Sequence, residues 1–473
     1  MTAAENRRRW WALMVLCLGV LMIVLDTTIV NVALPSIRTD LGFSETSLVW
    51  VVNAYMLTFG GFLLLGGRLG DLYGHRRLFL AGIVLFTVAS LGCGLAQSQA
   101  MLIVARSVQG LGGAVVSAVA LSLIMNLFPD AQGRAKAMGV YGFVCAAGGS
   151  IGVLLGGLLT GTMGWHWIFL VNLPIGAAVF VLCLMLIDAG TGQAGQKLDL
   201  GGAFTVTTAL MLAVYAVVNG NQAGWTSTQT LGLLVSAAVL LAMFLFIESR
   251  AKSPLMPLSL FKLRNVATAN VAGVLWAAAM FAWFFISALY MQLVLEYTPL
   301  QVGLAFLPAN LIMAALSLGA SAKIVMRYGF RLPLAAGLGL AAAGLALFAR
   351  APVDGTFIAD VLPGMTLLGL GAGIALNPML MSAMSDVDPA DSGLASGVVN
   401  TSFMMGGALG LAVLASMAAA RTEALQGAGA AQASALTGGY HLAFALGALF
   451  ALAAAGLGAW FMRNATVRAG APA

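Results

Sequence analysis

The chain has 473 residues, of which 61% are hydrophobic and only 8% carry a charge, whereas roughly 25% of the residues in an ordinary soluble domain are charged. This composition excludes a soluble enzyme and predicts an all-α integral membrane protein surrounded by the lipid bilayer. The formal net charge of +6 is explained by the Lys and Arg residues that short cytoplasmic loops retain, so it gives no reason to expect nucleic-acid binding.

Apolar stretches predict fourteen transmembrane helices, because about twenty residues cross the hydrocarbon core. The predicted spans are 10–34, 48–69, 78–97, 101–127, 136–160, 165–187, 200–219, 230–248, 266–295, 300–322, 332–349, 358–384, 393–420 and 440–462. With the N-terminus inside, most of the 22 Lys and Arg residues fall in cytoplasmic segments. This bias predicts a multi-pass protein of the cell membrane with both termini in the cytoplasm.

The longest polar intervals bracket two spans, so the chain divides into six, two and six spans. The segments Arg68 to Arg76 and Lys323 to Arg331 share a Tyr-Gly pair and a following Arg. Two related halves explain this similarity, and a chance match of short loops is the alternative. The predicted parts are an N-terminal six-helix half at 1–187, two inserted helices with their linkers at 188–262, and a C-terminal six-helix half at 263–473.

Asp26 lies deep in the first predicted span. A carboxylate at membrane depth costs several kcal/mol unless it is paired, hydrated or protonated, so Asp26 is the best candidate in the chain for loading and releasing a proton. The alternatives are an acid that stays ionised near the membrane surface and an acid locked in an ion pair.

Arg106 is the only basic residue deep in a predicted span. Because arginine stays charged, its side chain must face a carboxylate, backbone carbonyls or a cavity rather than lipid. Placed opposite Asp26, it would tune the proton affinity of that carboxylate. An arginine that reaches up to the membrane surface is the alternative.

The segment from Gly67 to Arg77 is predicted to be a short loop between spans 2 and 3, with Asp71 among several cations. Asp71 can accept hydrogen bonds from free backbone amides, from Arg76 or from Arg77, in a contact that one conformation makes and another breaks. We therefore interpret the segment as a latch that holds one conformation closed. A solvated turn explains the same residues equally well.

Span 5 carries glycines at four-residue intervals, which predicts a helix face that allows close backbone contact or local bending. Static packing explains the pattern as well as a hinge does. The glycines assigned to this face are Gly148, Gly152, Gly156 and Gly157.

Motifs for enzymatic chemistry are weak. Residues Gly190 to Gly195 match a dinucleotide-binding pattern, but they lie between spans and lack the expected following acid. The histidines have no metal-ligand spacing and there is no phosphate-binding loop, so we expect no metal, no cofactor and an ion gradient as the energy source. The residues considered for metal or redox chemistry are His75, His166, His441, Cys17, Cys93, Cys145 and Cys183.

These motifs are similar to those of the major facilitator superfamily, and specifically of its fourteen-span drug:proton antiporter branch, over nearly the whole chain. Leu25 to Pro35 matches the span-1 motif of that branch, and Gly164 to Pro174 resembles a further signature. The resemblance implies a gating role for Asp71 with the following cations, and a proton-transfer role for Arg106. The matched residues are Gly67, Arg68, Gly70, Asp71, Gly74, Arg76 and Arg77 in the gating loop, Gln109 and Gly110 in span 4, and the four glycines of the span-5 exporter motif.

Three departures from the family pattern are visible. Val153 stands where the span-5 motif usually has Pro, which puts a proline hinge in doubt. Leu72 and His75 replace basic residues of the gating loop. Phe403 and Met404 stand where the branch often has Arg-Gln, so a polar role at that point is lost.

The sequence as a whole predicts an exporter that exchanges inward-moving protons for an amphipathic small molecule, with cationic substrates favoured and a monomer sufficient for function. A proton-linked exporter or symporter of a specific metabolite, nutrient or lipid is the alternative. Weaker candidates for contact with the substrate are Asn31, Glu296 and Asp360, and the last two are better explained as solvated loop acids near span ends.

Overall fold

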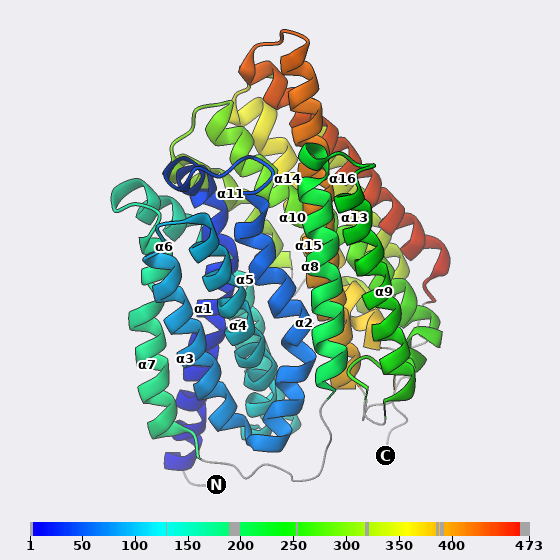
Figure 1. Ribbon diagram of the computed structural model, residues 1–473. Helices are drawn as coiled ribbons and strands as arrows, with labels where there is room; N and C mark the ends of the chain where they lie inside the picture. The colour runs from blue at the N-terminus through cyan, green and yellow to red at the C-terminus, as the bar shows by residue number, and fades with distance from the viewer. Residues whose placement is uncertain are drawn as a thin grey trace.

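The computed structural model describes residues 3–128, 130–188, 199–251, 254–316, 321–384, 387 and 392–463. Within these ranges every regular element is a helix, and the helices form one long bundle (Figure 1). We call the end that holds the start of α1 the terminal end and the opposite end the far end.

Helices from the first part of the chain cross the bundle in alternating directions. They are α1 (Ala3–Leu41), α2 (Val49–Tyr73), α3 (His75–Gly94), α4 (Gln99–Leu127), α5 (Ala131–Thr162), α6 (Trp167–Leu170), α7 (Asn172–Leu186), α8 (Leu200–Ala223) and α9 (Thr228–Arg250).

The second part of the chain continues in the same way. Its elements are η1 (Leu258–Lys262), α10 (Arg264–Leu293), α11 (Pro299–Ala315), α12 (Ser321–Tyr328), α13 (Arg331–Phe348), η3 (Phe357–Val361), α14 (Leu362–Met384), α15 (Ser392–Gly427) and α16 (Gln432–Phe461).

The prediction of an all-helical membrane protein is confirmed for the described residues. Thirteen helices are long and apolar enough to cross a membrane, and the shorter apolar helix Pro299–Ala315 lies where the tenth span was predicted. Large apolar side chains such as Val239, Phe246 and Trp460 are exposed on the outside of the bundle, as expected of a surface that faces lipid. The count of fourteen spans stays a prediction.

Some predicted loops are helical instead. Helix α1 runs on through Pro35 to Leu41 and α15 runs to Gly427, so Arg38 and Arg421 lie in helices and not in loops. The prediction failed because the loss of apolar character marks where a span leaves the hydrocarbon core, whereas a helix ends only where its backbone turns.

The predicted loop from Gly67 to Arg77 is also mostly helical. Helix α2 continues to Tyr73 and α3 begins at His75, so Asp71 lies in the last turn of α2. Gly74 makes the turn alone, with φ of 91°, in the left-handed region that glycine adopts at little cost.

Several sequence predictions lie outside the described residues. They concern the Gly190–Gly195 match and most of the polar interval between the sixth and seventh predicted spans.

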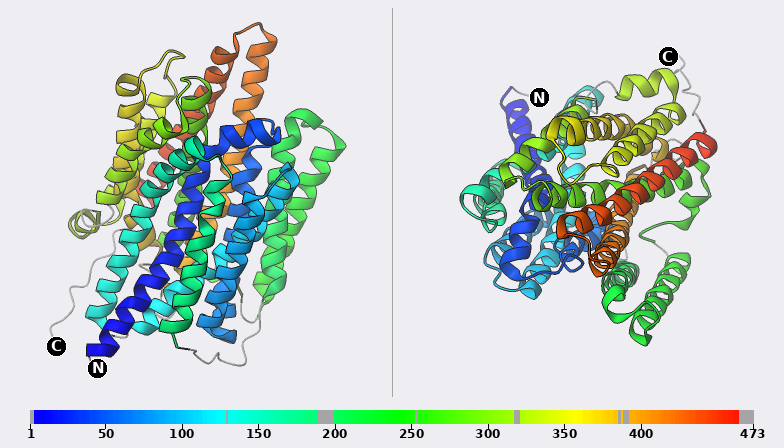
Figure 2. Two further views of the ribbon diagram at one scale, coloured as in Figure 1. Left: turned by 90° about the vertical axis from the view of Figure 1, so that its left-hand side faces the viewer. Right: turned by 90° about the horizontal axis from the view of Figure 1, so that it is seen from above.

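Two groups of helices pack within themselves. In the first, α4 packs on α2 and α3, α5 on α1, and α7 on α1 and α3; in the second, α14 packs on α11 and α13, α15 on α10, and α16 on α10 and α13. Helices α8 and α9 form a hairpin at the edge of the bundle (Figure 2), where α8 touches both α2 and α15.

The two groups meet where α2 packs on α15 and α5 packs on α11. At the far end the approach of α5 to α11 is very close, since a Cβ added to Gly157 would lie 2.6 Å from the carbonyl oxygen of Pro299. Gln292 Nε2 donates a hydrogen bond of 3.0 Å to the Val32 carbonyl nearby. These contacts join the two groups at the far end.

We expect Gly157→Ala to lower the thermal unfolding midpoint of the purified protein, at a cost of about 1–3 kcal/mol, because the new methyl group meets fixed backbone atoms. Gly161→Ala in the same helix is the matched control, because an added Cβ there has nothing within 4 Å. Equal midpoints for the two variants in detergent would contradict this description of the α5–α11 contact.

Candidate functional site

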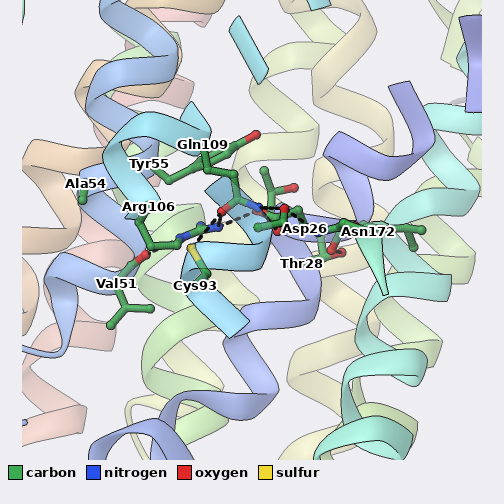
Figure 3. A network of polar contacts seen from close by, with 12 residues as sticks. Asp26, Thr28, Val51, Ala54, Tyr55, Cys93, Arg106, Gln109 and Asn172 are labelled. Atoms are coloured by element: carbon green, nitrogen blue, oxygen red, sulfur yellow. Dashed lines mark hydrogen bonds and ion pairs between the residues drawn. The ribbon is translucent and has the colours of Figure 1, made fainter. Parts of the chain in front are cut away.

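A buried ion pair lies at the centre of the first group of helices (Figure 3). Arg106 Nη1 in α4 donates to Asp26 Oδ2 in α1 over 2.5 Å, and each residue is only 1% exposed. Both residues were predicted as candidates from the sequence, and the structure brings them into direct contact.

Two amide side chains complete the surroundings of the Asp26 carboxylate. Gln109 Nε2 donates to Asp26 Oδ1 over 2.7 Å and Asn172 Nδ2 donates to the same oxygen over 3.1 Å. The same two nitrogens lie 2.7 Å and 3.3 Å from Ser90 Oγ. Both oxygens of the Asp26 carboxyl group therefore accept hydrogen bonds, one of them from a cation.

The Arg106 guanidinium has partners on its other sides as well. Its Nε donates to the Val51 carbonyl over 2.9 Å and Nη1 donates to Gln109 Oε1 over 2.6 Å. Its Cζ lies 4.5 Å from the centre of the Tyr55 ring, within the range of a cation–π interaction. A buried charge is tolerated only when it is paired in this way.

Glycines in α4 allow α2 to reach this arginine. A Cβ added to Gly110 would lie 2.4 Å from the Tyr55 carbonyl oxygen, and one added to Gly113 would lie 2.8 Å from the Tyr55 hydroxyl. Arg106 and Gln109 are three residues apart and therefore share one face of α4. Close packing of α2 on α4 thus follows from the same short segment that supplies the charged group.

The sequence did not single out three members of this network: Ser90, Tyr55 and Asn172. Asn172 occurred only within a segment that resembles a family signature, and the other two were not named. Neutral polar residues are common in membrane helices, so only their position beside Asp26 and Arg106 distinguishes them.

The predicted gating residues lie at the terminal end. His75 Nε2 lies 3.2 Å from Asp71 Oδ1, and Arg76 donates over 2.9 Å to the Leu184 carbonyl. Asp71 therefore contacts His75, not Arg76 or Arg77, in this conformation. Gly67, Arg68 and Gly70 belong to the last turns of α2.

A cavity of about 810 Å³ opens beside the gating residues. Acidic and basic side chains from the start of α1, the α2–α3 turn and the end of α7 share its wall with apolar residues of α4. The charged or titratable lining residues are Glu5, Arg8, Arg9, Asp71, His75, Arg76 and Asp188.

The start of α1 is tied to its neighbours by ion pairs. Arg8 lies 2.8 Å from Asp188 beyond α7, and Arg9 lies 3.1 Å from Asp130 before α5. Asp130 also caps α5 by accepting from Gly133 N–H over 2.6 Å. The hydrogen bond from Gly133 and the contact with Arg9 lower the pKa of Asp130.

The span-5 glycines do not all face the same helix. Added Cβ atoms on Gly148, Gly152 and Gly156 would meet α1, whereas one on Gly157 would meet α11. The difference follows from the helical rotation of about 100° per residue. Gly157 therefore serves the contact between the two groups of helices, and the other three serve packing within the first group.

The weaker candidates do not join the Asp26 network. Asn31 is buried and donates to the Thr27 carbonyl over 3.3 Å. Glu296 is exposed and has φ of 56°, and Asp360 accepts from Thr356 N–H over 2.7 Å at the start of η3. The Asp360 side chain therefore binds the backbone just before η3.

Residues that depart from the family pattern are accommodated by packing. Val153 is fully buried, and a Cβ added to Gly303 in α11 would lie 2.8 Å from its carbonyl oxygen. The rings of Phe403 and Phe281 lie 6.0 Å apart in an edge arrangement. Among the described residues no group of three or more His, Cys, Asp or Glu could hold a metal ion.

The comparisons with known proteins all indicate the same family. Residues 16–411 match the Major Facilitator Superfamily. The chain is 38% identical over 451 residues to the puromycin resistance protein pur8 of Streptomyces alboniger, covering 93% of this chain and 89% of the relative. It is 38% identical over 416 residues to the cephamycin export protein CmcT of Amycolatopsis lactamdurans, covering 87% of this chain and 85% of the relative.

A further relative and one solved structure are also similar to this chain. The multidrug resistance protein Stp of Mycobacterium tuberculosis is 38% identical over 415 residues, covering 88% of this chain and 77% of the relative. The crystal structure of a bacterial homologue of the human lysosomal transporter Spinster, inward-facing and unoccupied, has a TM-score of 0.65 at 16% identity, covering 95% of this chain and 96% of that chain. The similarity to this solved structure shows that the two proteins share a fold.

We expect Arg106→Gln to destabilise the folded protein by about 3–5 kcal/mol, because it leaves the buried Asp26 carboxylate without its cation. The double variant Asp26→Asn with Arg106→Gln should be more stable than Arg106→Gln alone, since it removes the uncompensated charge. Thermal unfolding in detergent, analysed as a double-mutant cycle, measures the coupling. Additive losses would show that the contact in Figure 3 contributes no coupling energy.

Proposed function

Because the chain belongs to the Major Facilitator Superfamily, we propose that this multi-pass membrane transporter exports amphipathic, cationic small molecules in exchange for protons. Relatives that are 38% identical carry the names of puromycin resistance, multidrug resistance and cephamycin export proteins. These names support export as the direction and drug-like molecules as the substrate class. Transport, not enzymatic turnover, is the activity.

The observation that carries the proton coupling is the buried Asp26–Arg106 pair. Asp26 is the carboxylate that can change its protonation, whereas Arg106 stays charged. In the described conformation Asp26 accepts from Arg106, Gln109 and Asn172, which suits the state after proton release. Proton uptake neutralises Asp26 and weakens its attraction to Arg106, so it favours a different arrangement of α1 and α4.

Alternating access follows from where the two groups of helices touch. The far end is joined by α5 with α11 and by the Gln292–Val32 hydrogen bond. Opening that end while the terminal end closes exchanges access to the site between the two sides. In this scheme Asp71, with Arg76 and Arg77 nearby, acts as the latch at the terminal end, and the glycines of α5 let the helices rock.

The packing pattern supports two related six-helix halves. The contacts of α1, α2, α3, α4, α5 and α7 recur, in the same chain order, among α10, α11, α13, α14, α15 and α16. With the α8–α9 hairpin between them, this gives fourteen spans. The excess of Lys and Arg at the terminal end supports a cytoplasmic location for that end and for both termini.

The proton gradient supplies enough energy for this exchange. One proton moving through roughly 100 mV releases about 2.3 kcal/mol, which supports roughly a fifty-fold substrate gradient. A single buried carboxylate in a single chain can therefore drive useful export.

We expect Asp26→Asn to abolish efflux driven by an imposed pH gradient, because asparagine cannot carry the proton. Transport is measured in vesicles as exclusion of a fluorescent amphipathic cation, with membrane insertion checked by the amount of folded protein. Asp354→Asn, on an exposed residue between α13 and η3, is the matched control and should transport like the wild type. Wild-type efflux by the Asp26 variant would remove this residue from the mechanism.

A further inference from the structure

A second pair of carboxyl groups lies in the α8–α9 hairpin, away from the Asp26 network. Asp199 directly precedes α8, and Glu248 lies in the last turn of α9. Glu248 is only 4% exposed. The coupling scheme above uses neither residue.

Each carboxyl group has one oxygen that is held and one that is not. Asp199 Oδ1 accepts from Gly202 N–H over 2.7 Å, and Glu248 Oε2 accepts from Met256 N–H over 3.1 Å. Asp199 Oδ2 and Glu248 Oε1 are buried and have no hydrogen-bond partner. A buried polar atom without a partner costs roughly 1–3 kcal/mol, so a hydrogen-bond donor between these two oxygens would stabilise the fold.

The two oxygens without partners face the same point. A Cβ added to Gly202 would lie 2.7 Å from Asp199 Oδ2 and 2.9 Å from Glu248 Oε1. Gly202 therefore leaves room for both carboxyl groups on one side of α8. Both oxygens thus border the same space beside Gly202. Two neighbouring carboxylates repel as anions, and a proton on one of them removes that repulsion.

The surrounding charges give the pair no cation among the described residues. No ion pair between described residues includes Asp199 or Glu248. Arg250, in the same helix, is exposed, and its Cζ lies 5.1 Å from the Phe246 ring centre. The remaining charged residues on described elements packed nearby are Arg68 and Asp71 at the end of α2 and the exposed Lys262 in η1. Lys197 and Lys252, which are near the pair in sequence, lie outside the described residues.

The helix ends decide which carboxyl group is the anion. Asp199 lies at the N-terminus of α8, where free amides favour negative charge, whereas Glu248 lies near the C-terminal carbonyl groups of α9, which disfavour it. The same N-terminal amides oppose a metal cation beside Asp199. A proton on Glu248 supplies a donor between the two oxygens, leaves Asp199 as the anion and requires no metal cation.

We propose that Asp199 and Glu248 form a second proton-binding site, in which Glu248 Oε1 carries the proton and donates it to Asp199 Oδ2. The step is an acid–base reaction: a proton from water binds Glu248, and one hydrogen bond forms in place of the repulsion between two acceptors. This inference does not depend on the role proposed for Asp26.

The proton would also stabilise the position of the linker between α9 and α10. Glu248 holds the backbone of Met256, and the adjacent Leu255 packs with Leu65 of α2 and Ala203 of α8. Occupancy of the site thus stabilises the contact between the hairpin and the α2 segment that leads to the turn at Gly74.

Thermal unfolding of the purified full-length protein between about pH 5 and about pH 8 tests the site. The folded wild type holds a proton that the unfolded chain releases, so its midpoint should fall by a few degrees as the pH rises through this range. Glu248→Gln keeps a donor toward Asp199 and cannot titrate, so the part of the fall due to this pair should disappear. Glu423→Gln, on an exposed residue of α15, should keep the wild-type profile.

Infrared difference spectra give a readout independent of stability. The carbonyl band of a protonated carboxyl group should titrate in the wild type, disappear in Glu248→Gln and remain in Asp26→Asn. Gly202→Ala, which pushes the two oxygens apart, should move the titration of this band to lower pH.

Two outcomes overturn the proposal. One is an identical band and pH profile in the wild type and Glu248→Gln. The other is a wild-type midpoint that rises with added Na⁺ or Mg²⁺ at constant ionic strength but not in Glu248→Gln, which would identify a cation as the ligand. Loss of efflux in Asp26→Asn has no bearing on either result.

Discussion

The contact between Asp26 and Arg106 is the constraint on which the first group of helices depends. Two unit charges that are each 1% exposed can remain inside a membrane protein only if every direction around them offers a partner. Five helices contribute groups to this network. Helix α1 supplies Asp26, and α4 supplies Arg106 and Gln109. Helix α2 supplies the Val51 carbonyl and the Tyr55 ring, α3 supplies Ser90, and α7 supplies Asn172. The glycines of α4 and α5 follow from this requirement, because the helices must come close for these short contacts to form.

The same constraint gives the proposed coupling a physical basis. A carboxylate with several donors resists protonation until a movement of the helices removes some of them. Arg106, Gln109 and Asn172 come from two helices, α4 and α7, while Asp26 comes from α1, so a shift between α1 and these helices changes the number of donors. Rocking of the helices and proton binding to Asp26 are then coupled, since each shifts the equilibrium of the other by the same free energy.

The sequence predicted the charged members of the site and Gln109, and missed the other neutral members. Asp26 and Arg106 were recognisable because an ionised group in an apolar helix is costly and therefore rare. Ser90 and Tyr55 carry no such signal, since their role depends on distances between helices that are far apart in the chain. Helix ends were misjudged for a related reason: hydropathy locates the hydrocarbon core, whereas the turn at Gly74 depends on a single backbone conformation.

The two carboxyl sites show how their partners determine the chemistry of an acid. Asp26 accepts from a permanent cation on Oδ2 and from two amide donors on Oδ1, so a movement of the helices changes its partners. Asp199 accepts from the Gly202 amide and Glu248 accepts from the Met256 amide, and each has a further buried oxygen beside Gly202 and forms no ion pair with another described residue. A proton is the smallest ligand that can join two such acceptors, and it requires no movement of the helices to enter. The first site is therefore suited to respond to a conformational change, and the second to hold the inserted hairpin in place while that change occurs.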